Sequence, residues 1–326
     1  MGTTVVYRGN FWPGWSTETH VAATLEAMGV TVLRAQEPST DPRETKPSSG
    51  WDDVVRLCLE AARRGPTMFL WTQTWNSDPE GGYRALAQLR EAGIPTAAFH
   101  LDLYWGIARQ VQIMEYPFWR TDHVFTADGG HDEGFARVGV NHHWLPPAVY
   151  DGEAVRGRRR QEYDWPIVFV GSYPYPHPEH AEARRQIIGH LQSKYGTRFR
   201  VFRGGIRGAD LSDLYASARV VVGDSCLAGK VSRYWSDRIP ETLGRGGFLI
   251  HPYVPGIEEH FTDGKHLRTY EAGDLGQLFA LVDHYLTRQD EARAIADEGM
   301  RHVQEHHTYR NRMEAVLDAV FGEDRP

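Results

Sequence analysis

The feature that most constrains this chain is the regular alternation of short apolar runs with longer amphipathic segments. In the first half, segments 18–29, 51–65 and 81–93 carry apolar residues at helical spacing. Apolar runs that we interpret as strands lie at 3–9, 30–35, 67–73, 94–100, 121–127 and 141–147. Strands separated by helices of about 10–15 residues indicate βαβ units and a parallel sheet.

The alternation stops at a polar stretch, 150–164, and then restarts. Strands are predicted at 165–172, 198–205, 219–225, 247–252 and 266–272, and helices at 179–196, 210–218, 274–289, 292–307 and 309–322. The length of 326 residues also favours two domains. The sequence therefore predicts an α/β protein with two Rossmann-like, doubly wound parallel-sheet domains.

We expect an N-terminal domain at 1–150, a linker at 151–164, a second domain at 165–305 and a C-terminal helix at 306–326. The C-terminal helices should pack back on the first domain. Ligands of open parallel sheets bind beyond the carboxyl ends of the strands. Two such domains that face each other would form a cleft, and the loops that follow the strands should carry the function.

Composition excludes several classes of protein. A formal net charge of −7 argues against a broad nucleic-acid-binding surface, although the basic run 156–160 could be a phosphate contact rather than a solvated linker. No window holds 18 uncharged apolar residues, so no membrane span is expected. The start of the chain lacks the pattern of a secretory signal, and its two cysteines show no metal or disulfide spacing. We therefore expect a cytoplasmic protein.

Two loops of the first half carry candidate functional residues. The loop after the first strand contains Trp12 and Trp15, and His20 follows in the next helix. The tryptophans either pack against the helix or stack on a sugar or acceptor. His100 and Asp102 directly follow a predicted buried strand, where they suit general-base or hydroxyl-binding work, or a helix cap with a packed histidine. Trp105 adds a further aromatic side chain for an acceptor.

The second half carries candidate anion-binding residues. Gly171 and Ser172 follow a strand and can present backbone N–H groups to a phosphate. Lys230, Arg233 and Arg238 place three cations ahead of a short predicted helix, an arrangement that suits a diphosphate or, alternatively, a solvated surface cluster.

Glu241 follows in the first turn of that helix. A carboxylate there either favours the helix dipole or accepts the hydroxyls of a ribose.

These motifs resemble those of glycosyltransferases with the GT-B fold. The segments "FVGS", "LYASARVVV" and "RIPETLGRGGFLI" resemble the CgeB-like group, which is related to glycosyltransferase family 4. The likeness is specific over 167–286 and only architectural over 1–150. It implies transfer of a sugar from a nucleotide-sugar donor, UDP-linked in our interpretation, bound mainly by the second domain, to an acceptor bound mainly by the first.

The resemblance also implies roles for single residues. Glu241 resembles the glutamate that holds the ribose, and Arg238, with Lys230 or Arg233, would neutralise the diphosphate leaving group. No cofactor or metal is expected, because such enzymes generally work without a bound metal and no Asp-x-Asp motif stands out. His100 resembles a histidine that touches the donor sugar.

Two departures from family 4 leave the stereochemistry open. Arg233 stands where that family has an earlier glutamate, and the loop after 171 lacks its Arg–Lys pair. We lean towards retention of configuration. In an inverting reaction, Asp102, His100 or His20 could be the base.

Two other functions fit the same architecture. One is a nucleotide-sugar 2-epimerase, and the other is a non-catalytic two-domain sugar-binding protein. The acceptor is not specified by the sequence: a glycan, a small aglycone or a modified DNA base are the alternatives, and the net charge gives no support to DNA.

Overall fold

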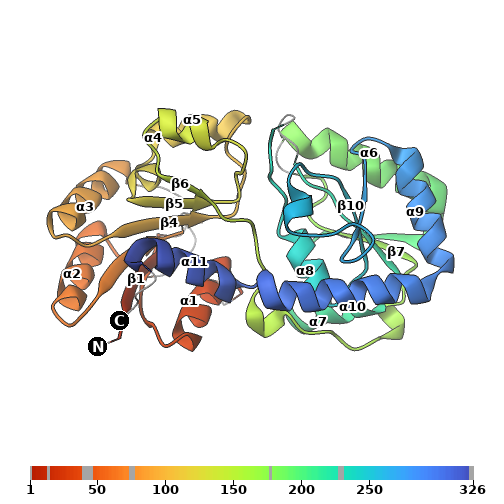
Figure 1. The fold of residues 1–326 in the computed structure, drawn as a ribbon, viewed down its shortest axis with the longest axis horizontal. Coiled ribbons are helices and arrows are strands. Elements are labelled where there is room, and N and C mark those ends of the chain that lie inside the picture. The colour runs from red at the N-terminus through yellow and green to blue at the C-terminus, as the bar shows by residue number, and fades with distance from the viewer. Residues whose placement is uncertain are drawn as a thin grey trace. The chain divides into compact units, whose positions relative to one another are not determined.

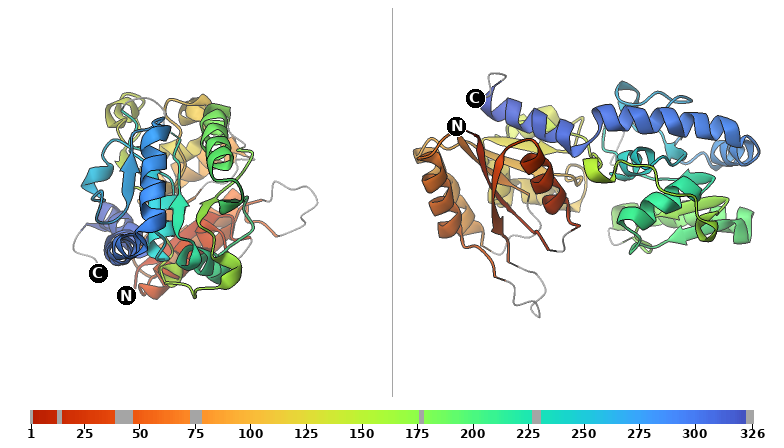
Figure 2. Two further views of the ribbon diagram at one scale, coloured as in Figure 1. Left: turned by 90° about the vertical axis from the view of Figure 1, so that its right-hand side faces the viewer. Right: turned by 90° about the horizontal axis from the view of Figure 1, so that it is seen from below.

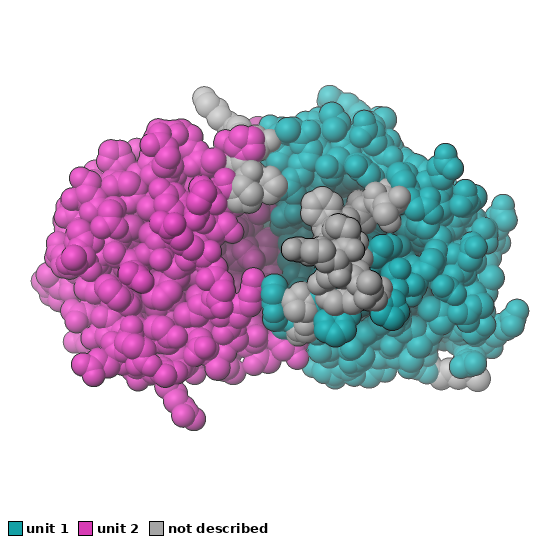
Figure 3. All heavy atoms as spheres, turned by 180° about the vertical axis from the view of Figure 1, so that it is seen from behind, with its two compact units in different colours: residues 1–146, 309–326 teal, residues 147–308 magenta. Residues whose placement is uncertain are grey.

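The computed structural model describes residues 2–12, 15–38, 47–72, 78–175, 178–226 and 231–322. The chain divides into two compact units (Figure 3). Unit 1 comprises Met1–Pro146 and Tyr309–Pro326, and unit 2 comprises Pro147–Thr308. The boundary expected at 150 lies close to the first crossing, and the helix expected at 306–326 belongs to unit 1.

Within the described residues, unit 1 contains a six-stranded parallel sheet in the order β2-β1-β3-β4-β5-β6 (Figure 1). Its strands are β1 (Thr4–Gly9), β2 (Thr31–Gln36), β3 (Thr67–Trp71), β4 (Thr96–His100), β5 (His123–Thr126) and β6 (His142–Trp144). Its helices are α1 (Thr17–Ala27), α2 (Trp51–Ala62), α3 (Pro79–Glu91), α4 (Gln112–Glu115), α5 (Asp132–Arg137) and α11 (Tyr309–Phe321), with 3-10 turns η1 (Ala108–Val111) and η2 (Pro117–Arg120).

Local sequence explains these elements. Strand β1 is buried on both faces, with Val5, Val6 and Tyr7 fully inaccessible, as expected for a central parallel strand. Helix α1 begins at a cap in which Ser16 Oγ accepts a hydrogen bond from the Thr19 amide at 3.1 Å. The resulting core is rich in aromatic side chains.

Unit 2 contains a five-stranded parallel sheet in the order β11-β10-β9-β7-β8 among its described residues. Its strands are β7 (Ile167–Val170), β8 (Phe199–Phe202), β9 (Val220–Val222), β10 (Leu249–Pro252) and β11 (Arg268–Tyr270). Its helices are α6 (Pro178–Tyr195), α7 (Gly208–Ser217), α8 (Arg238–Gly244), α9 (Leu275–Thr287) and α10 (Gln289–His306), with 3-10 turns η3 (Asp151–Glu153), η4 (Gln161–Tyr163), η5 (Gly196–Arg198) and η6 (Ile257–Glu259). Two parallel-sheet α/β units of this kind confirm the predicted fold class.

The polar segment that opens unit 2 is fastened to that unit. Arg156 pairs with Asp297 of α10, and the backbone amide of Arg158 donates to Asp213 of α7 at 2.7 Å. Arg160 pairs with Asp213 at 3.4 Å. Three of the five residues in the basic run 156–160 therefore contact carboxylates of α7 or α10, so the run is neither a wholly solvated linker nor free of protein partners.

The C-terminal helices divide between the units. Helix α11 packs against α1, β4 and β5 of unit 1, where Nε of Arg312 donates to the Pro146 carbonyl at 2.6 Å (Figure 2). Helix α10 packs instead on α8 and α9 of unit 2. The expected return to the first domain therefore holds for α11, and α9 and α10 cover unit 2. No helix in the described part of the chain has the length and apolar character needed to cross a membrane.

Candidate functional site

The strand order of unit 2 creates a switch point between β7 and β9. The chain leaves β7 through α6 to β8 on one side, and it leaves β9 through α8 to β10 on the other. Ligands of such sheets bind at the carboxyl ends of the strands where the direction changes. Gly171 follows β7 directly and Asp224 lies just after β9, so both residues mark this place.

Asp224 lies at the centre of a buried cluster of charged side chains. Its Oδ2 accepts hydrogen bonds from Nε2 of His180 (2.8 Å) and from Nε of Arg184 (2.7 Å). Its Oδ1 accepts from Nη2 of Arg184 (3.0 Å) and from Nη1 of Arg238 (2.7 Å). The four side chains are at most 10% exposed, so this network is shielded from solvent.

The cluster holds more positive than negative charge. Burial opposes ionisation of Asp224, but Arg238, His180 and Arg184 together hold the pKa of its carboxyl well below the usual range. One carboxylate therefore faces two guanidinium groups within the cluster, and Asp237 also interacts electrostatically with Arg238. A buried cation of this kind favours an anionic ligand, because charge-assisted hydrogen bonds are strong in a shielded site.

Arg238 is fixed against the end of β7. Its Nε donates to the Val170 carbonyl at 2.9 Å, and its Nη1 donates to the Asp224 carbonyl at 2.8 Å. A Cβ at Gly171 would lie 2.6 Å from Nη2 of Arg238, and Gly171 has a φ of +153°. Glycine is required here because any side chain would displace the guanidinium.

The predicted residues Gly171, Ser172 and Arg238 are thus brought together. The Ser172 carbonyl accepts a hydrogen bond from Nη1 of Arg184 at 3.0 Å. Arg184 also stacks on Tyr175, with its guanidinium carbon 3.9 Å from the ring centre. The loop after β7 is therefore tied to the buried cluster at two positions, Ser172 and Tyr175.

A second polar network supports the loop that leads into α8. Oγ of Ser225 accepts from the Ser236 amide at 3.2 Å and lies 3.1 Å from Nε2 of His251. Nδ1 of His251 lies 2.8 Å from the Pro252 carbonyl and must donate to it, so Nε2 accepts from Ser225. Burial lowers the pKa of His251 to about 4, and this histidine is neutral at pH 7.

Glu241 lies one helical turn from Arg245, and the two form an ion pair. Nε of Arg245 donates to Oε2 of Glu241 at 2.9 Å, and Nη2 of Arg245 lies 2.8 Å from the same oxygen. Nη2 of Arg245 also donates to Glu153 of η3. Burial, with Asp237 and Glu153 nearby, outweighs Arg245 and raises the pKa of Glu241 to about 7.

The other two predicted cations differ. Arg233 forms an ion pair with Glu259 of η6 and lies against Gly256, so its structural partner is a carboxylate of unit 2. Lys230 lies outside the described residues. The roles of both residues towards a diphosphate stay predictions.

In unit 1, His100 and Asp102 lie at the end of β4 in one hydrogen-bonded group. The Asp102 amide donates to Nδ1 of His100 at 3.1 Å, so Nε2 carries the proton of the neutral ring and lies 3.2 Å from the Tyr104 hydroxyl. The Asp102 carboxylate, half exposed, pairs with Nη1 of Arg109 at 2.7 Å and lies 3.9 Å from Nδ1 of His100.

Asp128, which follows β5, holds the loop after β4 through hydrogen bonds to its backbone. Its Oδ2 accepts from the amides of Tyr104 (2.8 Å) and Trp105 (2.7 Å). Asp128 is fully buried, and burial raises its pKa to about 6 despite these hydrogen bonds.

The remaining predicted residues of unit 1 do not form a single hydrogen-bonded group with His100 and Asp102 in the contacts described above. Trp12 and Trp15 are about half exposed in the loop after β1, at 53% and 48%. His20 lies in the first turns of α1 and is half-buried. Trp105 is stacked on His131 and packs against Phe135, so part of its ring surface is covered by side chains of unit 1.

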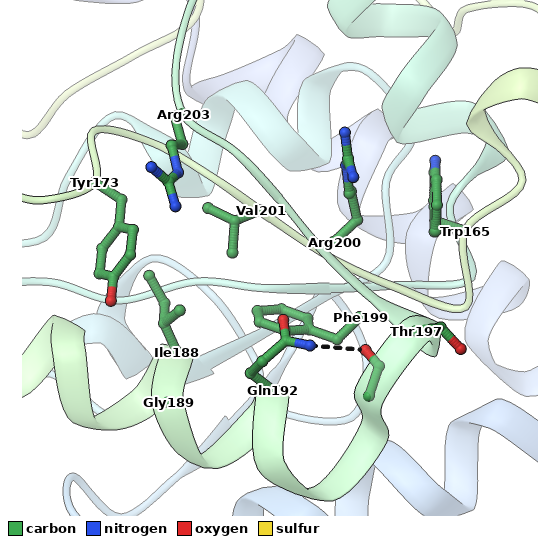
Figure 4. A pocket seen from close by; sticks show the side chains of 11 residues that line it. Trp165, Tyr173, Ile188, Gly189, Gln192, Thr197, Phe199, Arg200, Val201 and Arg203 are labelled. Carbon is green, nitrogen blue, oxygen red and sulfur yellow. Dashed lines mark hydrogen bonds between the residues drawn. The ribbon is translucent and has the colours of Figure 1, made fainter.

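A separate pocket of about 780 Å³ lies beside the edge strand β8. Figure 4 shows Arg203 near Tyr173 at one end and Arg200 near Trp165 at the other. Between them, side chains of α6 and η5 line the pocket. The described residues contain no group of three or more histidine, cysteine, aspartate or glutamate side chains placed to hold a metal ion.

Sequence reasoning missed the partners that complete the site. The candidates predicted from the sequence do not include Asp224, His180, Arg184, Arg245, Glu153 or Asp128. His180 and Arg184 occur four residues apart in a helix, which places them on one face, and this spacing was the available signal.

The sequence comparisons agree with this architecture. Residues 157–318, about half of the chain and nearly all of unit 2, match a family model described as glycosyl transferase-like. No curated protein sequence matches the chain.

Solved structures share the fold of both units. Sucrose-phosphate synthase from Thermosynechococcus elongatus is 15% identical with a TM-score of 0.61, covering 98% of this chain and 99% of that one. OtsA is 11% identical with a TM-score of 0.63 over the full length of both chains. HepE from Anabaena, solved with UDP and glucose, is 11% identical with a TM-score of 0.56, covering 97% and 99%. The chain is therefore identified as a glycosyltransferase-family protein with the GT-B fold.

Proposed function

We propose that this protein transfers a sugar from a nucleoside-diphosphate donor that unit 2 binds at the switch point of its sheet. The observation that carries the proposal is the buried cluster with two arginines and one aspartate. Its two guanidinium groups lie at the carboxyl ends of β7 and β9, in the part of the chain that matches the glycosyltransferase-like family. A diphosphate supplies the negative charge that this cluster lacks.

Different residues of unit 2 would bind the diphosphate and the ribose of the donor. Arg238 and Arg184, with backbone N–H groups of the loop at Gly171, would hold the diphosphate, and Glu241 would accept the ribose hydroxyls. Because these groups are positioned before the ligand arrives, they would stabilise the charge that develops on the diphosphate as it departs. The HepE structures with UDP and with UDP-glucose support UDP as the first nucleotide to test.

Unit 1 would bind the acceptor. Trp12 and Trp15 expose flat apolar surface suited to stacking on a sugar ring, and the half-exposed Asp102 carboxylate, held beside His100, can accept a hydroxyl proton. In the reaction, the bond from the sugar to the diphosphate breaks, the acceptor oxygen bonds to the sugar, and the acceptor proton passes to a base or to the departing diphosphate.

Ligand binding tests the proposal. The full chain is titrated with uridine, guanosine, adenosine and thymidine diphosphates and their sugar conjugates, with thermal unfolding as the readout, since a ligand that binds the native state raises the transition temperature. We expect one base to stabilise the protein and a mutant with Arg238→Met to lose the effect. The absence of any shift with the wild-type protein would refute donor binding.

Turnover then separates the related activities. A transferase incubated with the donor alone should hydrolyse it slowly at most, whereas an epimerase would interconvert two nucleotide sugars. Donor binding without turnover on any acceptor or on the donor alone would instead favour the non-catalytic sugar-binding alternative.

A further inference from the structure

The most completely bonded side chain near the proposed donor site is Arg245. Its Nη1 donates to Oγ of Ser212 at 2.8 Å and to the Gly208 carbonyl at 3.2 Å. Its Nε and Nη2 contact Glu241, and Nη2 also reaches Glu153. Arg245 is 1% exposed, whereas each glutamate is 23% exposed. The guanidinium therefore joins α7, α8 and η3 in a single fixed arrangement.

The charge of this group is opposite to that of the Asp224 cluster. Two carboxylates share one guanidinium, so the triad of Glu153, Arg245 and Glu241 has a formal net charge of −1. Both contacts of Glu241 with Arg245 use Oε2, so Oε1 is not engaged by this arginine. A net-negative, half-buried carboxylate favours ligand groups that donate hydrogen bonds and disfavours phosphate oxygens.

We infer that Arg245 and Glu153 are positioning residues for the donor: Arg245 orients Glu241 towards the ribose hydroxyls, and Glu153, which pairs with the same guanidinium, fixes Arg245 in place. The inference rests on the proposed function, because it needs a ribose at Glu241. It assigns the two halves of a nucleoside diphosphate to two places of opposite charge within unit 2. Neither Arg245 nor Glu153 touches the reacting atoms.

The charged and titratable groups that face Glu241 predict the direction of each effect. On α8 these are Arg245, which lowers the pKa of Glu241, and Asp237, which raises it. Glu153 of η3 raises it as well, and from α7 the buried hydroxyl of Tyr215 interacts with Glu241. An ionised Glu241 accepts two ribose hydroxyls, so UDP affinity should fall as the pH drops below about 7.

Two substitutions should move this pH dependence in opposite directions. Glu153→Gln removes a negative neighbour and keeps the side-chain shape, so the loss of UDP affinity should shift to lower pH by roughly 1 unit. Arg245→Met removes the cation and should shift the loss to higher pH, with weaker UDP binding at pH 7. Glu162→Gln is the matched control, because Glu162 is an exposed glutamate of the same segment that pairs with Arg160.

The experiment measures the dissociation constants of UDP and of inorganic pyrophosphate from pH 5.5 to 8.5 by calorimetry. Pyrophosphate has no ribose, so its binding should follow the Asp224 cluster and show the same pH dependence in wild type, Glu153→Gln and Arg245→Met. Opposite shifts for UDP alone support the inference. A purely structural role would instead change stability and weaken both ligands without separating their pH profiles.

Three results would overturn the inference. The first is a pH dependence of UDP binding in Glu153→Gln that equals that of wild type. This test remains valid even if Arg245→Met does not fold. The second is an equal shift for UDP and pyrophosphate, and the third is a shift in the Glu162→Gln control of the same size. If wild-type protein binds pyrophosphate but no nucleoside diphosphate, the proposed donor site itself fails, which is a different outcome from any of these three.

Discussion

Replacing Asp224 with asparagine tests the charge balance of the buried cluster in unit 2. The substitution keeps the size of the side chain and removes its charge, so Arg184 and Arg238 lose the carboxylate that both contact. The amide nitrogen of the new side chain would also face hydrogen-bond donors. Removal of one partner of a buried ion pair costs about 3–5 kcal/mol, because the remaining charge stays in the interior.

The expected change in thermal stability follows from this energy. For a domain of 150–250 residues, 1 kcal/mol corresponds to about 2–4 °C in the transition temperature. Unit 2 spans Pro147–Thr308, so Asp224→Asn should lower its transition by roughly 6–20 °C. Near-ultraviolet circular dichroism in chloride buffer at pH 7 measures this, and phosphate is left out because an anion would compensate the charge.

Asp283→Asn provides the control within the same unit. Asp283 is half exposed and pairs with Lys194 at 2.7 Å, and pairs of this kind contribute about 0–1 kcal/mol. Because the folded pKa of Asp224 is lowered, its stabilisation exists above the unfolded pKa and is lost only as the pH falls through the folded value. The deficit of Asp224→Asn should thus be constant between pH 6 and 8. Equal effects of the two substitutions would refute the argument.

Three further results are expected. Gly171→Ala should weaken pyrophosphate binding at least tenfold by calorimetry, because its Cβ would lie 2.6 Å from Arg238, whereas Gly189→Ala, which has open space in α6, should leave binding unchanged. The decrease in the free energy of unfolding by urea as the pH falls from 6.5 to 4 should be smaller in His251→Gln than in wild type, since the buried His251 has a pKa lowered to about 4 and the unfolded chain takes up its proton first; equal pH profiles of the two proteins would contradict this. Asp102→Asn should lower kcat by about 10²–10⁴ with little change in donor KM, as measured by initial rates, and an unchanged kcat would exclude Asp102 as a general base.

The fold was accessible from the sequence because its periodicity is strong. Apolar runs such as 3–9 and 165–172 became β1 and β7, and the helical spacing at 51–65 became α2. The short elements were not accessible: α4 and α5 span four and six residues, too few to show a period. These two helices depend on packing in unit 1, and a local sequence pattern contains no information about that packing.

The candidate site was accessible only in part. A glycine after a strand and cations before a short helix pointed to Gly171 and Arg238, which the structure places together. Arg184 could not be distinguished from the other polar residues of the long helix α6. Its orientation towards Asp224 follows from the packing of α6 on the sheet, which the sequence does not show. Glu241 was interpreted either as favouring the helix dipole or as a ribose ligand, and neither interpretation included Arg245, which pairs with it from one helical turn further on.

The return of the chain to unit 1 after Thr308 has a consequence for how the protein is made. Unit 1 is interrupted by unit 2, so the whole of unit 2 is synthesised before α11 is added. Until then, the surface of α1, β4 and β5 that α11 covers remains open, with the places of the buried Met313, Val316 and Leu317 unfilled. Unit 2 is a continuous stretch whose core needs no later segment, whereas the core of unit 1 is complete only when α11 has been added.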